Sequence, residues 1–335
     1  MNRLLLMLHL MIILASSCGR EALYQNYFGE TQGTTFNILY QEKPFLNINA
    51  TNKAIDSRLS EIDRTFSLYN SGSLLSAINR NEEISVDSLF TELFTLSMNI
   101  SELTGGLYDP TVGPLVRAWG FGPDAIRNFD PTLVDSLMNL VGFRKVRIED
   151  GCLMKDNPGI CLDMNAIAQG FTVDLICRLL DELGIRSYLV EIGGEVRAKG
   201  MRGDRLWRVG VDRPVDGNIY PGRDLAAIIE LDNEALATSG NYRRFYVEDG
   251  VKYSHTINPL TGMPARNRIL SATVISDNAA TADAFATACM VAGPAGAMEM
   301  INRYDFLEGY LIYSGDAGEF LTWTSAGLTG RLKEE

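Results

Sequence analysis

An acidic and a hydroxyl side chain stand four residues apart near the start of an apolar segment. Asp283 and Thr287 fall within residues 278–292, whose composition predicts a helix. Residues four apart share one face of a helix, and a carboxylate with a hydroxyl on that face can hold a hard cation such as Mg²⁺. The same pattern also fits a capping Asp and a Thr bonded to the preceding turn. The pair alone favours this structural role, and the metal site needs other support.

His255 is the only histidine beyond the first twenty residues. It lies in a polar segment that turns at Pro259 and Gly262. Imidazole has an ordinary pKa of roughly 6.5, so this side chain can accept a proton near neutral pH. The segment therefore offers a candidate general base, although a lone histidine is more often structural or on the surface.

Three further segments combine polar residues with turns. Asp163 lies where a strand passes into a helix, over residues 162–170, and either Asp163 or Asn165 could cap that helix or face a ligand. Residues 238–242 could contact a phosphate or a sugar, or form only a turn, and Gly193-Gly194 could admit a ligand to the backbone. The glycine pair is not a G-x-G-x-x-G fingerprint. The chain carries no G-x-x-x-x-G-K-[ST], G-x-S-x-G or H-E-x-x-H pattern, which disfavours the P-loop, serine hydrolase and zinc protease classes.

The net charge of -12 argues against binding to nucleic acid, which rewards basic surfaces. It argues equally against broad electrostatic adhesion to anionic lipid. An anionic ligand would need local help on such a chain, and a metal ion or helix N-termini could supply it.

The N-terminus has the pattern of an export segment. A basic start at Arg3 precedes an apolar run over residues 4–15, which is too short to span a bilayer comfortably. Ser16-Ser17-Cys18 follows and resembles a bacterial lipoprotein processing site, with Cys18 as the lipidated residue. The alternative is ordinary cleavage nearby, with Cys18 incidental. We expect a signal peptide over residues 1–17 and a lipid-anchored tether over 18–32.

The elements that must position these residues mix helices and strands without strict alternation, which predicts an α+β fold with antiparallel sheet. Among the other cysteines, Cys177 and Cys289 lie in apolar helical runs, whereas Cys152 and Cys161 could pair or remain thiols. Helices are predicted over 49–65, 88–104, 131–140, 166–183, 278–292 and 295–303, and strands over 34–40, 145–148, 159–162, 187–192, 206–211, 225–231, 244–247, 252–256, 269–276, 306–313 and 319–323.

Taken in order, these segments resemble the FAD:protein FMN transferase family, the ApbE-type flavin transferases. Each segment is modest, but their order is specific. The resemblance runs from about Gly33 to Phe320 and rests on residues 33–36, 66–69, 75–79, 106–115, 119–122, 163–170 with Asp174, 191–195, 238–242, 254–262 and 283–288.

The resemblance implies a T-fold-like α+β domain over residues 33–330, with two lobes around an FAD cleft. It implies Mg²⁺ held by Asp283 and Thr287 with backbone oxygens of Ala166 and Ala286. Many relatives carry Lys where this chain has Gln169, so one fixed positive charge near FAD is missing, although Gln can still donate hydrogen bonds. The implied FAD contacts are Gln32, Tyr69, Leu107, Tyr108, Asp109, Asp163, Gln169 and Leu270.

The implied reaction is Mg²⁺-dependent transfer of FMN from FAD to a Thr or Ser hydroxyl of a partner protein, with release of AMP. His255 is the candidate base. The acceptor would be an exported or membrane-bound protein with an S/D-G-A-T-type motif, and the lipid anchor implies the bacterial cell envelope, at the inner membrane facing the periplasm. Two rivals are an FAD pyrophosphatase, in which water replaces the protein hydroxyl, and a flavin-binding lipoprotein without turnover.

Overall fold

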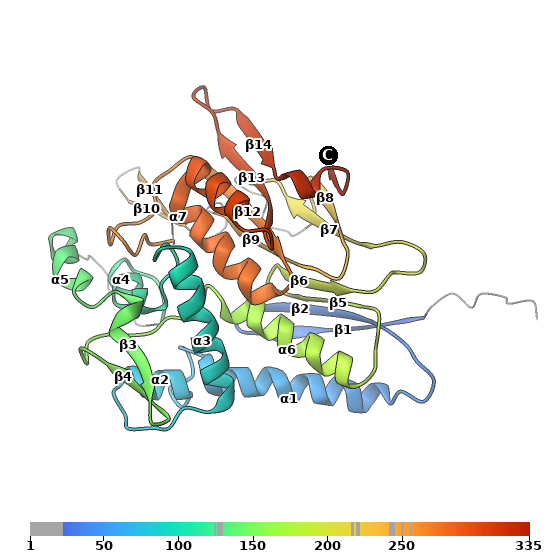
Figure 1. The fold of residues 1–335 in the computed structure, drawn as a ribbon, viewed down its shortest axis with the longest axis horizontal. Helices are drawn as coiled ribbons and strands as arrows, with labels where there is room; N and C mark the ends of the chain where they lie inside the picture. Colours follow the sequence, from blue (N-terminus) through green and yellow to red (C-terminus); the bar gives the residue numbers. More distant parts are fainter. Residues whose placement is uncertain are drawn as a thin grey trace, which may run out of the picture.

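A computed structural model describes residues 23–123, 125, 130–215, 218, 222–240, 245–248, 251–254 and 256–335. One large antiparallel sheet crosses the molecule, with helices packed on one face (Figure 1). Its eight strands lie in the order β1-β2-β5-β6-β9-β12-β13-β14. They are β1 (Tyr24–Thr31), β2 (Thr34–Gln41), β5 (Tyr188–Ile192), β6 (Glu195–Lys199), β9 (Ala235–Gly240), β12 (Ile269–Ser276), β13 (Glu308–Ser314) and β14 (Phe320–Thr324).

Apolar side chains leave the large sheet in both directions, because successive residues of a strand point to opposite faces. On one face, Ile38 and Val190 pack with residues of α1 (Ile48–Phe66) and α6 (Ala168–Glu182). On the other face, Leu236 and Ile275 pack against a three-stranded sheet in the order β15-β8-β7. Those strands are β7 (Trp207–Asp212), β8 (Leu225–Leu231) and β15 (Leu332–Glu334).

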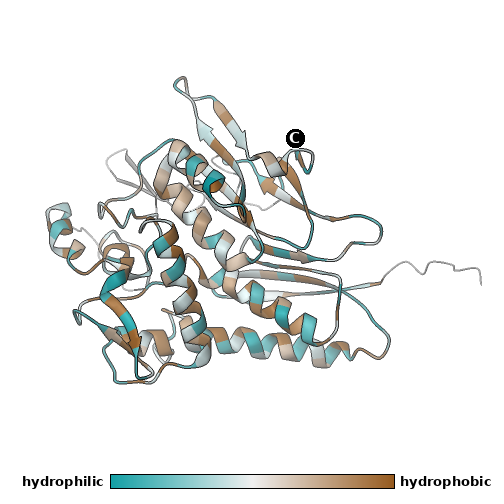
Figure 2. Cartoon of the chain, viewed as in Figure 1, coloured by the Kyte–Doolittle hydropathy of each residue, from teal (hydrophilic) through white to brown (hydrophobic). Residues whose placement is uncertain are grey.

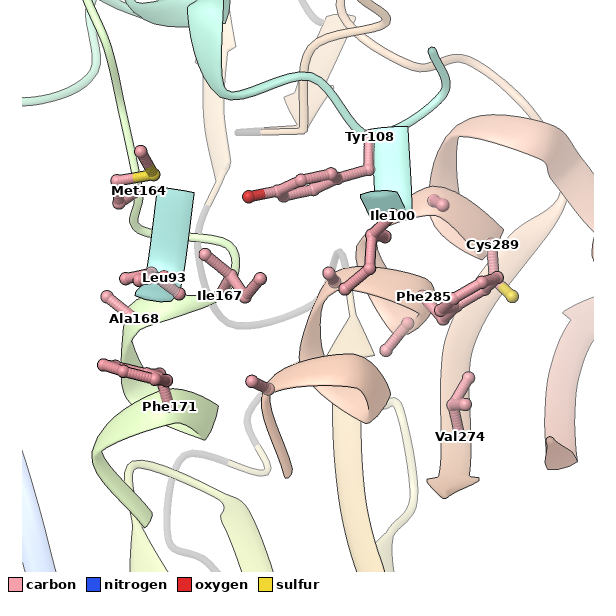
Figure 3. Packing of buried hydrophobic residues seen from close by; sticks show 14 of the residues in the cluster. Leu93, Ile100, Tyr108, Met164, Ile167, Ala168, Phe171, Val274, Phe285 and Cys289 are labelled. Carbon is pink, nitrogen blue, oxygen red and sulfur yellow. The ribbon is translucent and has the colours of Figure 1, made fainter. Parts of the chain in front are cut away.

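A second group of elements packs against α6 and α7 (Ala279–Arg303) through the largest apolar cluster, which includes Phe90, Tyr108 and Phe285. Figure 3 shows part of this cluster. The remaining elements are α2 (Leu74–Asn79), α3 (Ser88–Leu103), η1 (Pro110–Val112), α4 (Gly113–Ala118), η2 (Pro131–Leu133), α5 (Val134–Met138), η3 (Phe143–Lys145), β3 (Val146–Glu149), β4 (Cys152–Lys155), β10 (Phe245–Glu248), β11 (Val251–Ser254) and η4 (Ala326–Leu328).

Helices α1 and α3 begin at side-chain caps that satisfy backbone N–H groups of the first turn. Asn47 accepts from the N–H of Ala50 at the start of α1, and Asp87 accepts from the N–H of Phe90 at the start of α3. Figure 2 shows polar and apolar residues alternating along α1, as expected for a helix with one buried face. The helices predicted over 49–65, 88–104 and 166–183 are therefore confirmed to within about two residues at each end.

Helix α7 is long and apolar enough to cross a membrane by length and composition, but most of it is buried inside the protein. It is therefore the central core helix. Gly293 interrupts it with non-helical backbone, at φ 73° and ψ 175°, just before Pro294. The predicted break between helices 278–292 and 295–303 is confirmed.

The predicted α+β class with antiparallel sheets is confirmed, but several local predictions were wrong. Residues 24–31 were assigned to a tether, yet they form β1 and pair along their whole length with β2. The predicted strand over 159–162 is irregular, and β4 lies earlier in the chain. Strands β6, β9 and β15 were missed, because short segments rich in Ala or charged residues become strands only when neighbouring strands pair with them. Cys152 and Cys161 are free thiols.

Candidate active site

The first turns of α6 and α7 cross in close contact. A Cβ added to Gly170 in α6 would lie 2.3 Å from the carbonyl oxygen of Ala279 in α7. Only glycine permits this approach without displacing one helix. At the crossing, the Gly170 N–H donates to Asp283 Oδ2 at 3.1 Å. The two helices thus place the Asp283 carboxylate between their N-terminal turns.

A buried ion pair fixes the start of α7. Asp174 of α6 accepts from the N–H groups of Ala279 and Ala280, at 3.0 and 2.9 Å. Its Oδ1 also lies 2.7 Å from a guanidinium nitrogen of Arg197 in β6. Asn278 completes the cap by accepting from the Thr281 N–H. The position of Asp283, one turn further along α7, is therefore set by α6, β6 and its own helix.

Asp283 is a buried carboxylate with no cationic partner in the part of the chain that the structure describes. It is 6% exposed, and no ion pair among the described residues includes it. Burial raises its pKa from 3.8 to about 7, while the Gly170 hydrogen bond lowers it. An ionised carboxylate in such a place is costly unless a cation or further donors compensate for the lost water.

The oxygen groups predicted to hold Mg²⁺ lie around this carboxylate. Thr287 follows Asp283 by one helical turn, and its Oγ1 lies 3.4 Å from Ser239 Oγ of β9. Ala286 is buried in the same helix, and Ala166 lies in the turn that leads directly into α6. In the part of the chain that the structure describes, no cluster of three or more His, Cys, Asp or Glu could hold a metal. One carboxylate with hydroxyl and carbonyl oxygens suits a hard ion such as Mg²⁺ rather than zinc.

Tyr108 joins the predicted acidic residues into one neighbourhood. Its ring is buried beside Ile100, Met164 and Ile167 (Figure 3), and its hydroxyl lies 3.0 Å from Ser97 Oγ. Burial raises the pKa of this phenol strongly, and the nearby carboxylates of Asp283, Asp109 and Asp163 raise it further. Three buried carboxylates therefore lie close enough to Tyr108 to influence its ionisation.

The three carboxylates differ in how they are satisfied. Asp109 accepts from the N–H and hydroxyl of Thr111 and from the N–H of Phe143, at 2.6–2.8 Å. These bonds give Asp109 a structural role, since they join η1 to the start of η3. Among the described residues, Asp163 accepts from Asn165, whose N–H lies 2.9 Å from its Oδ1, and burial raises its pKa. Asp163 and Asp283 therefore keep more acceptor capacity for a ligand than Asp109 does.

Two amide side chains flank the first turns of α6. Gln32, in the turn between β1 and β2, donates from Nε2 to Thr172 Oγ1 at 2.6 Å. Gln169 Nε2 lies over Gly193, where an added Cβ would be 2.7 Å away. Helix α6 begins without a side-chain cap, so its N-terminal dipole also favours an anion there. Donors from two segments, the turn between β1 and β2 and α6 itself, thus lie at the N-terminal end of α6.

The profile of the ApbE family matches residues 32–311, which span the whole of this arrangement. This chain belongs to the ApbE family. A Vibrio cholerae relative named FAD:protein FMN transferase is 38% identical over 84% of this chain and 85% of its own length. A Haemophilus influenzae relative with the same name is 31% identical over 94% of each chain. The solved flavin transferase ApbE from Vibrio cholerae superposes with a TM-score of 0.83, at 34% identity, over 92% of this chain and 99% of that one.

The other FAD contacts predicted for this ApbE-family chain lie in separate places. Tyr69 is 73% exposed in the connection between α1 and α2. Leu107 is half-buried against the largest apolar cluster. Leu270 is the unpaired residue at an irregularity of β12, where the register with β13 shifts between Ile269 and Ser271. Their roles in FAD binding stay predictions.

Cys18 and His255 lie outside the described residues, as do Asn241 and Tyr242. The turn that follows position 255 is nevertheless anchored. Trp119, at the end of α4, donates from Nε1 to the Gly262 carbonyl at 2.7 Å. Two of the recognised ApbE segments, 119–122 and 254–262, therefore meet in space.

Sequence reasoning missed Thr172 and gave Arg197 no role. Nothing in the sequence marks Thr172, because its partner Gln32 is 140 residues away and the contact arises only from packing. Arg197 does not stand out in the sequence either, because β6 also carries Glu195 and Lys199. Ser239 lay within the polar segment 238–242, and only the pairing of β9 with β12 brings it beside α7.

Proposed function

We propose that this chain is an FAD:protein FMN transferase, which moves FMN from FAD to a Thr or Ser hydroxyl of an acceptor protein and releases AMP. The observation that carries this proposal is the buried, unpaired Asp283 at the crossing of α6 and α7, in a chain of the ApbE family. Relatives that align over most of the chain are named as enzymes of this activity.

Asp283 and Thr287, with backbone oxygens of Ala166 and Ala286, fit Mg²⁺ by their chemistry. Bound there, the ion would neutralise charge on the FAD pyrophosphate and on the departing AMP. The α6 N-terminus and the amides of Gln32 and Gln169 would orient the phosphates by hydrogen bonding. Since an amide carries no charge, this chain relies more heavily on its metal for neutralisation than a relative with Lys at position 169.

The transfer step needs a proton acceptor. The acceptor hydroxyl oxygen forms a bond to the FMN phosphorus, the phosphorus–oxygen bond to AMP breaks, and the hydroxyl proton passes to a base. We assign that base to His255, whose ordinary pKa suits neutral pH. General base catalysis contributes about 10²–10⁴-fold, so His255→Ala should lose transfer by about that factor while FAD still binds.

The cellular setting is also a proposal. Lipidation of Cys18 would hold the enzyme at the inner membrane, facing the periplasm. An acceptor with an S/D-G-A-T-type motif at the same membrane would share that surface, which raises the effective concentration of the two proteins. The export pattern of residues 1–18 supports this arrangement.

Intact mass of an acceptor domain tests the activity. The chain from Gly19 is incubated with FAD, Mg²⁺ and an exported acceptor domain bearing the motif. A mass gain of one FMN, absent without Mg²⁺ and with Asp283→Ala, is the expected result. Free FMN and AMP beside an unchanged acceptor would instead identify a pyrophosphatase. Intact bound FAD under every condition, with several acceptors, would contradict both activities.

A further inference from the structure

One end of the molecule combines exposed apolar and basic side chains. Leu23 is 67% exposed, Met201 is 46% exposed and Phe45 is fully exposed. Arg202, Arg205 and Arg208 are also exposed. We call these six residues the anchor-side surface. Leu23 directly precedes β1, and Phe45 lies in the connection between β2 and α1. The other four residues lie in the connection between β6 and β7 and at the start of β7. These three segments lie at the same end of the molecule in Figure 1.

Direct contacts hold the three segments together. The Tyr24 hydroxyl donates to the Met201 carbonyl at 2.8 Å and accepts from the Gly203 N–H at 3.3 Å. The Tyr24 ring packs edge-on against Trp207, with ring centroids 5.5 Å apart. On the other side, the Glu42 N–H donates to the Leu23 carbonyl at 2.8 Å. The three segments that carry the anchor-side surface are therefore joined at the first residues of β1.

Phe45 combines a fully exposed ring with a strained backbone conformation. Its φ is 66°, in the left-handed region that bulky residues rarely adopt. A phenylalanine in solvent at a strained position gains nothing from the fold of a single chain. Strain of this kind is a reason to look for a function, and an exposed aromatic ring is suited to the interfacial region of a bilayer.

The three arginines line a surface pocket of about 370 Å³ together with Leu206. Arg205 and Arg208 form only long ion pairs, at 3.9 Å with Asp204 and at 3.8 Å with Glu230. Arg202 lies over the Trp207 ring. Such loosely paired guanidinium groups remain available for a phosphate, which they bind with two parallel N–H donors. This basic pocket stands out on a chain whose net charge is -12.

We propose that the anchor-side surface docks on a bilayer of anionic phospholipid. The arginines would bind headgroup phosphates, while Phe45 and Leu23 enter the interface. The chain outside the described residues supports this occupant, since only four residues separate Cys18 from Leu23 and they reach at most about 18 Å when extended. The orientation rests on the proposed lipidation of Cys18, and the surface itself does not depend on flavin transfer.

Vesicle sedimentation tests the surface without the lipid anchor. The chain from Gly19 retains every residue that the structure describes. It should sediment with vesicles containing about one third phosphatidylglycerol and far less with phosphatidylcholine alone.

The combined substitution of Arg202→Gln, Arg205→Gln and Arg208→Gln should weaken binding to the anionic vesicles about tenfold or more, because each basic residue near such a surface contributes roughly fivefold. Phe45→Ser should weaken it at any salt concentration, whereas the arginine contribution should fade at about 0.5 M salt.

Matched variants separate this effect from loss of charge or apolar area in general. Arg80→Gln, Arg144→Gln and Arg147→Gln remove three exposed arginines from another part of the molecule, and Phe320→Ser removes an exposed ring from β14. These controls should keep the partition. Equal losses of vesicle binding in the anchor-side variants and in the control variants would overturn the proposal, as would equal binding to both vesicle types. Pairing of this surface with a second copy of the chain would overturn it too.

Flavin transfer to a soluble acceptor provides the independent readout. All of these variants should retain that activity and their melting temperature, because none of the substituted residues belongs to the active site. Failure of the transferase assay with intact vesicle binding would reject the proposed function alone. Intact transfer without vesicle binding would reject the docking surface alone.

Discussion

Asp109, Asp163 and Asp283 illustrate how identical side chains acquire different roles from their surroundings. All three are buried near Tyr108. Asp109 is satisfied by three donors of its own chain, whereas one N–H donates to Asp283. A buried carboxylate with full hydrogen bonding stabilises the fold, and one that lacks partners costs stability until a cation binds. Opposite effects of the same Asp→Asn change are therefore expected at these positions.

Asp283→Asn should stabilise the metal-free protein above neutral pH. Asn removes the buried charge while its amide oxygen still accepts from Gly170. The expected gain in the free energy of unfolding is at most about 4 kcal/mol, since the pKa is raised from 3.8 to about 7 and each pKa unit corresponds to about 1.4 kcal/mol. Chemical denaturation with EDTA present measures it. Mg²⁺ should stabilise the unsubstituted chain and leave the variant unchanged, and an equal Mg²⁺ effect on both would place the metal elsewhere.

Asp109→Asn should destabilise the protein, in contrast to the change at Asp283. The new NH₂ group would face a donor that now binds the carboxylate, either of Thr111 or of Phe143. An unsatisfied buried donor costs about 1–3 kcal/mol. The same denaturation series provides the measurement. A neutral result at Asp109 would mean that its hydrogen bonds do not hold η1 against η3.

Lowering the pH should weaken Mg²⁺ binding. The pKa of Asp283 is raised to about 7 in the metal-free fold, so the folded chain binds a proton between about pH 4 and pH 7 that the unfolded chain releases. The free energy of unfolding of the metal-free protein therefore falls as the pH rises through this range. Mg²⁺ competes with the same proton, so its dissociation constant should rise steeply below pH 7 and level off above it. Calorimetric Mg²⁺ titrations across this range, with Asp283→Asn as control, measure the effect.

At the scale of elements, the crossing of α6 and α7 positions the site. Asp174 of α6 caps α7, and Asp283 of α7 accepts from α6, so each helix orients the other. The pair Arg197–Asp174 ties this crossing to β6. A small shift of either helix would move the Asp283 carboxylate relative to Thr287 and the Ala166 turn.

Gly170→Ala should damage both stability and activity. The new methyl would overlap the Ala279 carbonyl, and overpacking of this kind costs about 1–3 kcal/mol or more. Gly72→Ala is a matched control, since its added Cβ would meet only the Asn70 side chain at 3.4 Å. Thermal melting and the acceptor mass assay give the two readouts. A Gly170→Ala protein with normal melting and full transfer would show that the crossing tolerates separation.

At the scale of the whole molecule, the sheet begins earlier than the sequence predicted. Strand β1 pairs with β2 along eight residues and ends at Thr31, directly before Gln32, whose side chain contacts α6. A lipid on Cys18, as proposed, would be separated from Leu23 by only four residues. Such a short segment would keep this end of the protein close to a membrane.

Truncation distinguishes a tether from a strand. A chain that starts at Leu23 should melt within about 2 °C of one that starts at Gly19, since surface changes usually cost less than about 0.5 kcal/mol. A chain that starts at Thr34 should melt far lower, because it exposes the apolar side chains under β1 and leaves β2 as an unpaired edge. Equal melting of all three chains would restore the tether interpretation.

The sequence by itself determined the α+β class, the principal helices, the break at Gly293 and the order of the ApbE segments. These depend on local periodicity, on capping residues and on motifs that can be read along the chain. The acidic and hydroxyl residues of the candidate site were found in the same way, because Asp283 and Thr287 are only four residues apart.

Tertiary structure alone decided which residues meet. Strands β1, β6 and β9 exist because neighbouring strands pair with them, and their own compositions are weak signals. The contact of Gln32 with Thr172, and that of Gly170 with Asp283, join residues more than a hundred positions apart. The difference between Asp109 and Asp283 also comes from packing, since a carboxylate acquires its pKa and its role from the donors and cations that the fold places around it.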